Sequence, residues 1–230
     1  MLDVEETDLA VDLIDAALRG PHRHLALGGD GPALRYRADV AFFASLGPDP
    51  DAVAWETLAA LPGERAGLIS GHPIDVPAPW MKLRELSVLL MSGRDVETSP
   101  PDPEIVALGD EDVPEMLDLV ARTGPGPFLA RTIDCGGYLG IRRDGVLAAM
   151  AGRRLHPPGW IEVSAVCTDP EYRGLGLGRR VTAAVVNRIR DDGAQAFLHV
   201  LPSNPARGLY ESMGFVGRRE SIITAVERAG

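Results

Sequence analysis

The chain has 230 residues, a length that suits one full domain with a smaller companion. Hydrophobic residues make up 45% of it and charged residues 24%, ordinary globular values that exclude a disordered chain. The net charge of −10 opposes nucleic acid and anionic membranes as default partners, and two cysteines are too few for a disulfide framework.

The first residues, MLDVEETDLAVDL, are acidic and lack the basic segment that opens a signal peptide. No apolar run approaches the roughly 18 residues that a membrane-spanning helix needs. We therefore expect a soluble, cytoplasmic protein.

The N-terminal part mixes helical and extended patterns. Apolar residues at helical spacing predict a helix over 5–19 and another over 50–61, the second capped by Asp49 or Asp51. Strands are predicted over 34–46, 67–70 and 83–91. No catalytic spacing occurs here, and the net −8 of residues 1–100 suits a solvated surface, or attraction of a cationic amine.

A proline-rich segment, SGRDVETSPPDPE at 92–104, interrupts these patterns. Its prolines forbid a helix and favour an extended linker. We place a domain boundary here, with an N-terminal α/β region over 1–99 and a second domain over 100–230.

The second half alternates strands and helices, which predicts an α/β (α+β) fold. A strand over 104–108 precedes a helix over 112–123 with Asp112 as its cap and Pro114 in its first turn. Residues 138–154 read as two strands joined at Arg143-Asp144-Gly145, a strong hairpin signal.

Further elements follow in the same alternation. A strand over 161–168 precedes a helix that ends at 190, in which apolar residues recur every four positions on one face. A strand over 195–201, a short helix over 204–213 stopped by Gly214, and a last strand over 221–227 complete the domain. The residues of the repeating apolar face are Leu177, Val181, Val185 and Ile189.

A glycine-rich loop joins the strand at 161–168 to that helix. Gly174, Gly176 and Gly178 let the backbone approach a ligand, and the free N–H groups of a first helical turn favour phosphate. Residues 171–190 hold five arginines and one acid, so a polyanion is expected here. The spacing G-x-G-x-G fits neither a dinucleotide fingerprint nor a Walker loop.

The run Arg173-x-x-Gly176-x-Gly178 resembles the acyl-CoA signature of the GNAT N-acetyltransferases. The segments PGPFLART, GYLGI, VLAAMAG, IEVSAVCTDPEYRG, FLHV and ARGLYESMGF are similar to one branch of that superfamily in the same order, over roughly 104–220. The resemblance implies a mixed central sheet flanked by helices. The region 1–99 could be a degenerate copy of this fold, but it lacks the signature, so we expect one CoA site.

The resemblance also implies how acetyl-CoA would be held. The pantetheine arm would pair like an added strand with Val166, Cys167 and Thr168, whose side chains belong to the core. We expect neither Cys167 nor Cys135 to be a nucleophile. The CoA pyrophosphate would lie on the loop amides of Arg173, Gly174, Leu175, Gly176, Leu177, Gly178 and Arg179.

Acetyl transfer to an amine needs a neutral amine, a donor to the oxyanion and stabilisation of the departing thiolate. A strand amide near Val166 could serve the oxyanion. By resemblance, Tyr210 faces the CoA sulfur, or else it only packs its helix. Glu162 is the candidate base because strand parity places it on the face of Ser164 and Val166, and His199 is the alternative.

One position departs from the family pattern. The family usually has an asparagine seven residues before this tyrosine, where this chain has Ser203 followed by Asn204. Either residue could contact CoA, or both could only cap the helix that begins at Pro205. The histidines are scattered, and no spacing suggests a metal.

We therefore expect an acetyltransferase that moves an acetyl group from acetyl-CoA to a primary amine, either a small molecule or a peptide. The alternative is a non-catalytic acyl-CoA-binding module, and a nucleotide-binding protein of another fold fits the loop spacing poorly. An exposed strand edge in the C-terminal half would make a homodimer unsurprising.

Overall fold

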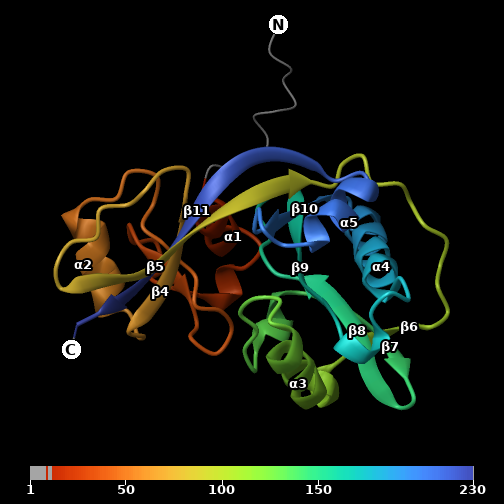
Figure 1. The fold of residues 1–230 in the computed structure, drawn as a ribbon. Coiled ribbons are helices and arrows are strands. Elements are labelled where there is room, and N and C mark those ends of the chain that lie inside the picture. The colour runs from red at the N-terminus through yellow and green to blue at the C-terminus, as the bar shows by residue number, and fades with distance from the viewer. Residues whose placement is uncertain (1–8, 10–11, 230) are drawn as a thin grey trace, which may run out of the picture.

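A computed structural model describes residue 9 and residues 12–229. The strands form one eight-stranded mixed sheet and a small three-stranded sheet (Figure 1). The helices are α1 (Leu13–Arg19), α2 (Ala52–Ala60), α3 (Val113–Thr123), α4 (Leu177–Asp191) and α5 (Ala206–Ser212). The strands are β1 (Ala26–Leu27), β2 (Leu34–Tyr36), β3 (Ala44–Ser45), β4 (Arg65–Ser70), β5 (Trp80–Ser92), β6 (Ile105–Leu108), β7 (Tyr138–Arg143), β8 (Val146–Arg153), β9 (Trp160–Thr168), β10 (Gln195–Val200) and β11 (Val216–Arg228).

The large sheet has the order β4-β11-β5-β10-β9-β8-β7-β6. Strands β9 and β10 run parallel, and the other neighbouring strands run antiparallel. The mixed sheet flanked by helices is thus confirmed. Two strands from before the proline-rich segment, β4 and β5, belong to the same sheet, and β5 lies between β11 and β10. The division at 92–104 stays a proposal.

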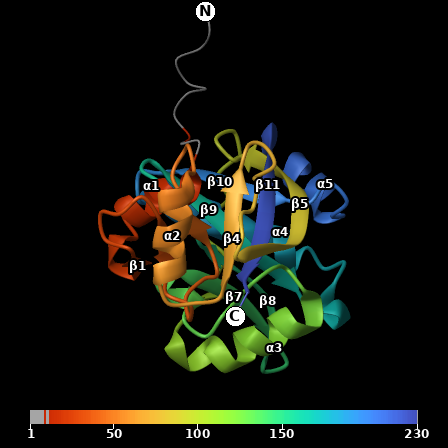
Figure 2. The same ribbon diagram turned by 90° about the vertical axis from the view of Figure 1, so that its left-hand side faces the viewer.

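Different helices cover the two faces of the sheet. The core on one face joins β7 to β10 with α4 and α5, and its α4 contribution is the predicted face of Leu177, Val181, Val185 and Ile189. On the opposite face α3 packs against β7, β8 and β9. The N-terminal elements cover the rest of that face, over Leu90, Trp160 and Phe197. In the turned view of Figure 2, α2 and α5 lie on opposite sides of β4 and β11.

Most predicted elements are found near their expected places. Asp51 caps α2, since its carboxylate accepts the Ala54 N–H at 2.9 Å. The hairpin between β7 and β8 turns through Asp144 and Gly145, which both have positive φ. The predicted helix over 5–19 appears as α1 from Leu13, and its first part lies largely outside the described residues.

One expected strand is wrong. The single strand over 34–46 is two short strands, β2 and β3, because a turn at 37–40 is closed by the Val40 N–H to the Arg37 carbonyl. Asp112 does occupy the N-cap position of α3, but its carboxylate makes no capping hydrogen bond there, because it accepts the Gly109 N–H at 2.8 Å and pairs with Arg142 at 2.5 Å. Pro114 does stand in the first turn. Among the described residues, no helix is both long and apolar enough to cross a membrane.

Candidate active site

A cleft opens where β9 and β10 separate. The parallel pairing of these strands runs from Gln195–Trp160 to Phe197–Glu162, and the described residues form no pair beyond it. A cavity of about 560 Å³ fills this opening, bounded by both strands, the C-terminal end of α3 and the start of α5. The backbone of β9 after Glu162 therefore has one edge paired with β8 and the other edge toward the cleft.

A β-bulge shapes this edge of β9. Ala165 has a φ of +52°, and the register against β8 shifts between Met150 and Gly152. Because the bulge adds one residue, the alternation of side chains is reset after Ser164. The side chain of Val166 packs into the α4 core, so the expected shared parity of Glu162 and Val166 is wrong.

The glycine loop ends in an uncapped helix. Gly174 and Gly176 have φ values of +79° and +73°, and a Cβ at either would meet no described atom within 4 Å. Gly176 is the N-cap of α4, where the described residues supply no side-chain hydrogen bond. The first-turn N–H groups of α4 are therefore available to an anion, as the sequence predicts.

The five arginines of 171–190 do not form one patch. Arg173 is exposed on the loop and lines the cleft, whereas Arg179 reaches Ser212 on α5. Arg180 points away to Asp102, with Nε at 2.7 Å from the carboxylate. Arg190 donates to backbone carbonyls of 93–96. Arg179 and Arg188 line a second cavity, on the outer side of α4, and Arg173 is the one of the five that lines the cleft.

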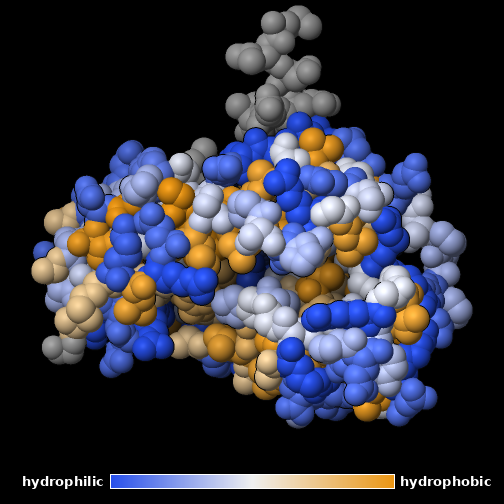
Figure 3. Space-filling model, in the orientation of Figure 1, coloured by the Kyte–Doolittle hydropathy of each residue, from blue (hydrophilic) through white to orange (hydrophobic). Residues whose placement is uncertain are grey.

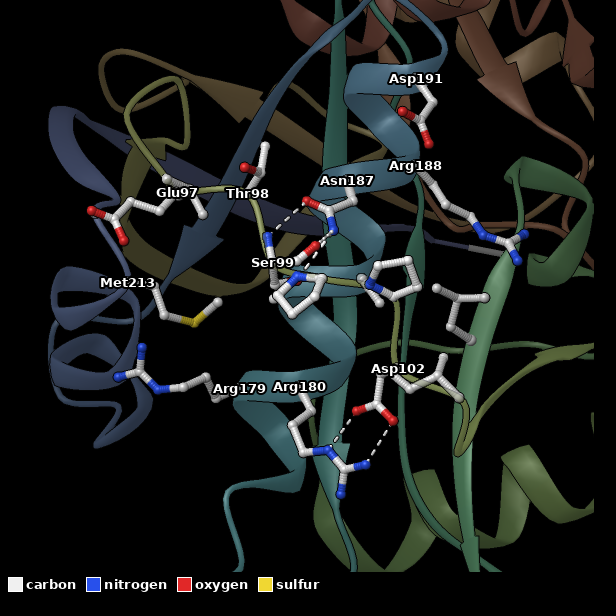
Figure 4. A pocket seen from close by; sticks show the side chains of 18 of the residues that line it. Glu97, Thr98, Ser99, Asp102, Arg179, Arg180, Asn187, Arg188, Asp191 and Met213 are labelled. Atoms are coloured by element: carbon white, nitrogen blue, oxygen red, sulfur yellow. Dashed lines mark hydrogen bonds and ion pairs between the residues drawn. The ribbon is translucent and has the colours of Figure 1, made fainter.

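A larger cavity, of about 1050 Å³, lies on the outer side of α4 beneath residues 95–103 (Figure 4). Two side chains of α4 in its lining hold the linker. Asn187 donates to the Ser99 carbonyl at 2.7 Å, and Arg180 pairs with Asp102 and Glu104. This cavity includes no residue of β9, so it does not adjoin the strand edge.

Tyr210 lies on α5 and lines the cleft, where it is 7% exposed. Burial raises the pKa of Tyr210 to about 12, and the ring packs edge-on against Phe215. Burial also raises the pKa of Cys167 to about 11, which agrees with the expectation that this thiol is not a nucleophile. Both groups are therefore neutral near pH 7.

Glu162 is buried, with a side chain 1% exposed, on the sheet face opposite α4. Arg154 binds it through two parallel contacts, Nε to Oε2 at 2.8 Å and Nη2 to Oε1 at 2.9 Å. His199 Nδ1 lies 2.8 Å from Oε1, and the Leu155 N–H lies 3.4 Å from Oε2. Burial alone would raise the pKa of Glu162, but Arg154 and His199 outweigh burial and hold the pKa far below its usual range.

His199 is the second buried polar group of this cluster. Its side chain is 4% exposed, and its Nε2 has no hydrogen-bond partner among the described residues. Both His199 and Glu162 line the cleft. The sequence does not single out Arg154, because its contact with Glu162 depends on how the chain turns after β8.

The remaining predicted residues divide by position. Asn204 lines the cleft and its side chain accepts the Ala206 N–H at 2.9 Å, a capping bond, whereas Ser203 is exposed beside it. Gly174, Leu175, Gly176, Leu177 and Arg179 lie in the adjoining loop and first turn of α4. The cleft itself is lined by Val166, Cys167, Thr168, Arg173, Gly178, Asn204, Glu162 and Tyr210.

A family model matches within the half of the chain that carries the cleft. Residues 138–223 match the family described as FR47-like protein. A mycothiol acetyltransferase from Thermomonospora curvata is 43% identical over 84 residues, which are 36% of this chain and 28% of that protein. The N-alpha-acetyltransferase RimI of Mycobacterium tuberculosis is 39% identical over 82 residues, which are 34% and 51% of the two chains. The matches thus span about a quarter to a half of these curated relatives.

Two solved structures match over nearly the whole chain. One, from Novosphingobium aromaticivorans and described as an acetyltransferase of the GNAT family, has a TM-score of 0.87 and 35% identity. The match covers 96% of this chain and 98% of that one. A GCN5-related N-acetyltransferase from Kribbella flavida has a TM-score of 0.62 at 20% identity, covering 100% and 97% of the two chains, which supports the fold alone.

Proposed function

The chain belongs to the GNAT acetyltransferase family, and from that premise we propose that it transfers an acetyl group from acetyl-CoA to a primary amine. The observation that carries this proposal is the unpaired edge of β9 beside an uncapped helix. The edge of β9 can pair with an extended amide chain, and the N-terminus of α4 can bind a pyrophosphate. Both features border one cleft.

The residues present fit acetyl-CoA. Gly174 and Gly176 have positive φ, a conformation that favours glycine. Because glycine has no side chain, the loop leaves room for phosphate oxygens beside the backbone. We propose that Arg173 and Arg179 add positive charge there and that the backbone of Val166 to Thr168 holds the pantetheine arm. Asn204 lies at the same cleft and can contact that arm while it caps α5.

When bound, acetyl-CoA supplies an activated acetyl group with a thiolate as the leaving group. We propose that a backbone amide near Val166 donates to the carbonyl oxygen as charge develops on it. Tyr210 donates a hydrogen bond to the departing sulfur. A phenol with a pKa of about 12 does not fully protonate a thiolate whose conjugate acid has a pKa of about 8.5, so Tyr210 stabilises mainly by hydrogen bonding.

The acceptor class follows from the relatives only in outline. The name of RimI specifies an N-alpha acceptor, and the name of the other relative specifies mycothiol. We propose a primary amine, on a small molecule or at a peptide N-terminus, as the acceptor.

Calorimetric titration with acetyl-CoA and with CoA tests the cofactor, using wild type and an Arg173→Ala/Gly176→Asp double variant. We expect micromolar binding by wild type and its loss in the variant, because the variant removes a cation and places an anion in the loop. Thiol release is then screened with amino acids, polyamines, aminoglycosides and peptides. Failure of wild type to bind either ligand would overturn the proposal, whereas binding without thiol release would favour a non-catalytic acyl-CoA-binding module.

A further inference from the structure

The Glu162 carboxylate has no free position at which to accept another hydrogen bond. An ionised carboxylate offers two oxygens with about four acceptor positions. Two donors from Arg154, His199 Nδ1 and the Leu155 N–H together occupy them. A carboxylate that is buried, paired and saturated in this way is a poor general base, because protonation would break the pair with Arg154.

The same contacts determine which nitrogen of His199 carries hydrogen. The ionised carboxylate can only accept, so Nδ1 must donate to Glu162 Oε1. In the neutral ring, Nε2 then holds the lone pair. This atom is buried without a partner among the described residues, in a side chain that lines the cleft. Native proteins rarely leave a buried polar atom unpartnered, and a catalytic role is one of the reasons when they do.

We propose that His199 Nε2 is the general base of the reaction, with Glu162 and Arg154 as positioning residues. The proposal rests on the proposed function, because a base is needed only if an amine is acetylated. Glu162 and His199 are arranged like other carboxylate–histidine pairs, in which the carboxylate sets the tautomer and orientation of the ring.

The proton balance of the step is simple. The amine nitrogen forms a bond to the acetyl carbon, and the bond between that carbon and sulfur breaks. The nitrogen gives up one proton to His199 Nε2, and the sulfur leaves as a thiolate that accepts a hydrogen bond from Tyr210. The imidazolium is stabilised by Glu162 until its proton passes to the thiolate, directly or through solvent, so the products are one amide and one thiol.

Other charged and titratable groups face this cluster and belong in any account of its pH dependence. Arg154 follows β8 and lies over the Phe43 ring at 4.9 Å, which places the guanidinium against the N-terminal region. Tyr36 and Cys135 interact electrostatically with Glu162, and burial keeps both neutral. The described residues of this set are Arg154, Glu162, Tyr36, Cys135, Tyr138, His156 and, from α5, Tyr210.

Nitrogen-15 NMR of the wild-type protein without ligand tests the tautomer directly. Long-range ¹H–¹⁵N spectra distinguish a protonated ring nitrogen from one with a lone pair, and the His199→Asn variant identifies the signals of this residue. We expect hydrogen on Nδ1 and a lone pair on Nε2 near pH 7.5. Hydrogen on Nε2 at that pH would overturn the inference, whatever the outcome of the acetyl-CoA titration.

Kinetics test the role itself, with the amine that gives the most thiol release. In His199→Asn the Asn amide can still donate to Glu162, but the base is gone. We expect kcat/KM to fall about 10²- to 10⁴-fold, the usual range for general-base catalysis, with the loss concentrated in kcat and the Kd for acetyl-CoA unchanged. The matched control His72→Asn makes the same change on the exposed surface and should leave both parameters unchanged.

Retention of kcat/KM within about threefold in His199→Asn would overturn the inference while leaving the proposed function intact. Absence of acetyl-CoA binding by wild type would instead overturn the proposed function, and the base assignment with it.

A double variant tests positioning. Arg154→Met/Glu162→Gln removes the ion pair as a unit, because removing one partner alone would leave a buried charge. We expect His199 to lose its fixed tautomer in the NMR spectra and kcat to fall. An unchanged tautomer would show that Glu162 does not position the ring.

Discussion

At the scale of single residues, we predict that the Tyr210 hydroxyl stabilises the leaving group. Tyr210→Phe keeps the ring that packs against Phe215 and removes only the hydroxyl. We expect kcat to fall about 10- to 100-fold with little change in the Kd for acetyl-CoA, because one hydrogen bond to a developing charge is lost. Steady-state kinetics and calorimetry on the same preparation check this. An unchanged kcat would mean that Tyr210 only packs α5.

Some features at single residues could be predicted from the sequence, and others could not. The glycine loop before α4 could be predicted because its signal is local, three glycines and an arginine between a strand and an amphipathic helix. The parity of Glu162 with Val166 could not, because the bulge at Ala165 has no glycine or proline to signal it. The pairing of Glu162 with Arg154 and His199 depends on residues brought together by three separate segments.

The start of α4 carries the prediction at the scale of elements. Gly176 and Gly193 flank this helix with φ values of +73° and +76°, and a Cβ at either would meet no described atom within 4 Å. Alanine at either site therefore costs about 1 kcal/mol of left-handed strain. Gly176→Ala should in addition weaken acetyl-CoA binding at least tenfold, because its methyl group would stand in the loop.

Unfolding in urea and calorimetry check this pair of variants together. The account requires similar losses of unfolding free energy in Gly176→Ala and Gly193→Ala but weaker binding only in the first. Equal acetyl-CoA affinities would remove the loop from the proposed cofactor site.

The order of strands was beyond sequence reasoning for a physical reason. Strand β5 has the expected apolar pattern, but its place between β11 and β10 depends on pairing across more than 100 residues. Local patterns predict that such a strand exists, and they carry no information about its partners. Helices α2 and α4, whose hydrogen bonds are local, were predicted nearly to their ends.

At the scale of the whole molecule, the N-terminal region is joined to the sheet through a buried histidine pair. His22 donates from Nε2 to the Cys135 carbonyl at 2.9 Å, so its Nδ1 accepts from the Tyr36 hydroxyl at 2.8 Å. The His156 ring lies 4.4 Å from the His22 ring, centre to centre. Burial lowers the pKa of His22 to about 4 and that of His156 to about 3, so both are neutral in the folded protein near pH 7.

Lowering the pH should therefore reduce the free energy of unfolding before the carboxylates titrate. The unfolded chain binds protons at these histidines below about pH 6.5 and the folded chain does not, so stability present above that pH is lost as the pH falls. Each histidine contributes up to about 1.4 kcal/mol of unfolding free energy per pH unit. Urea unfolding between pH 6 and pH 5 measures this slope, which should be roughly halved in His156→Gln. An unchanged slope would contradict the account.

The surface gives no sign of a broad apolar docking face on the side seen in Figure 3, where apolar side chains occur in scattered patches. The cleft beside β9 and the larger cavity beside α4 are two alternative places for acetyl-CoA among the described residues. They share no lining residue, but residues 173–180 include members of both linings, so 163–168 and 95–103 are the segments that distinguish a ligand in one cavity from a ligand in the other.

Hydrogen–deuterium exchange with and without acetyl-CoA tests the central claim most directly. The account predicts slower exchange in peptides that cover 163–168 and 173–180 and little change in 95–103. Protection of 95–103 without protection of 163–168 would place the ligand in the cavity beside α4, and would contradict the assignment of the cleft between β9 and β10 as the active site.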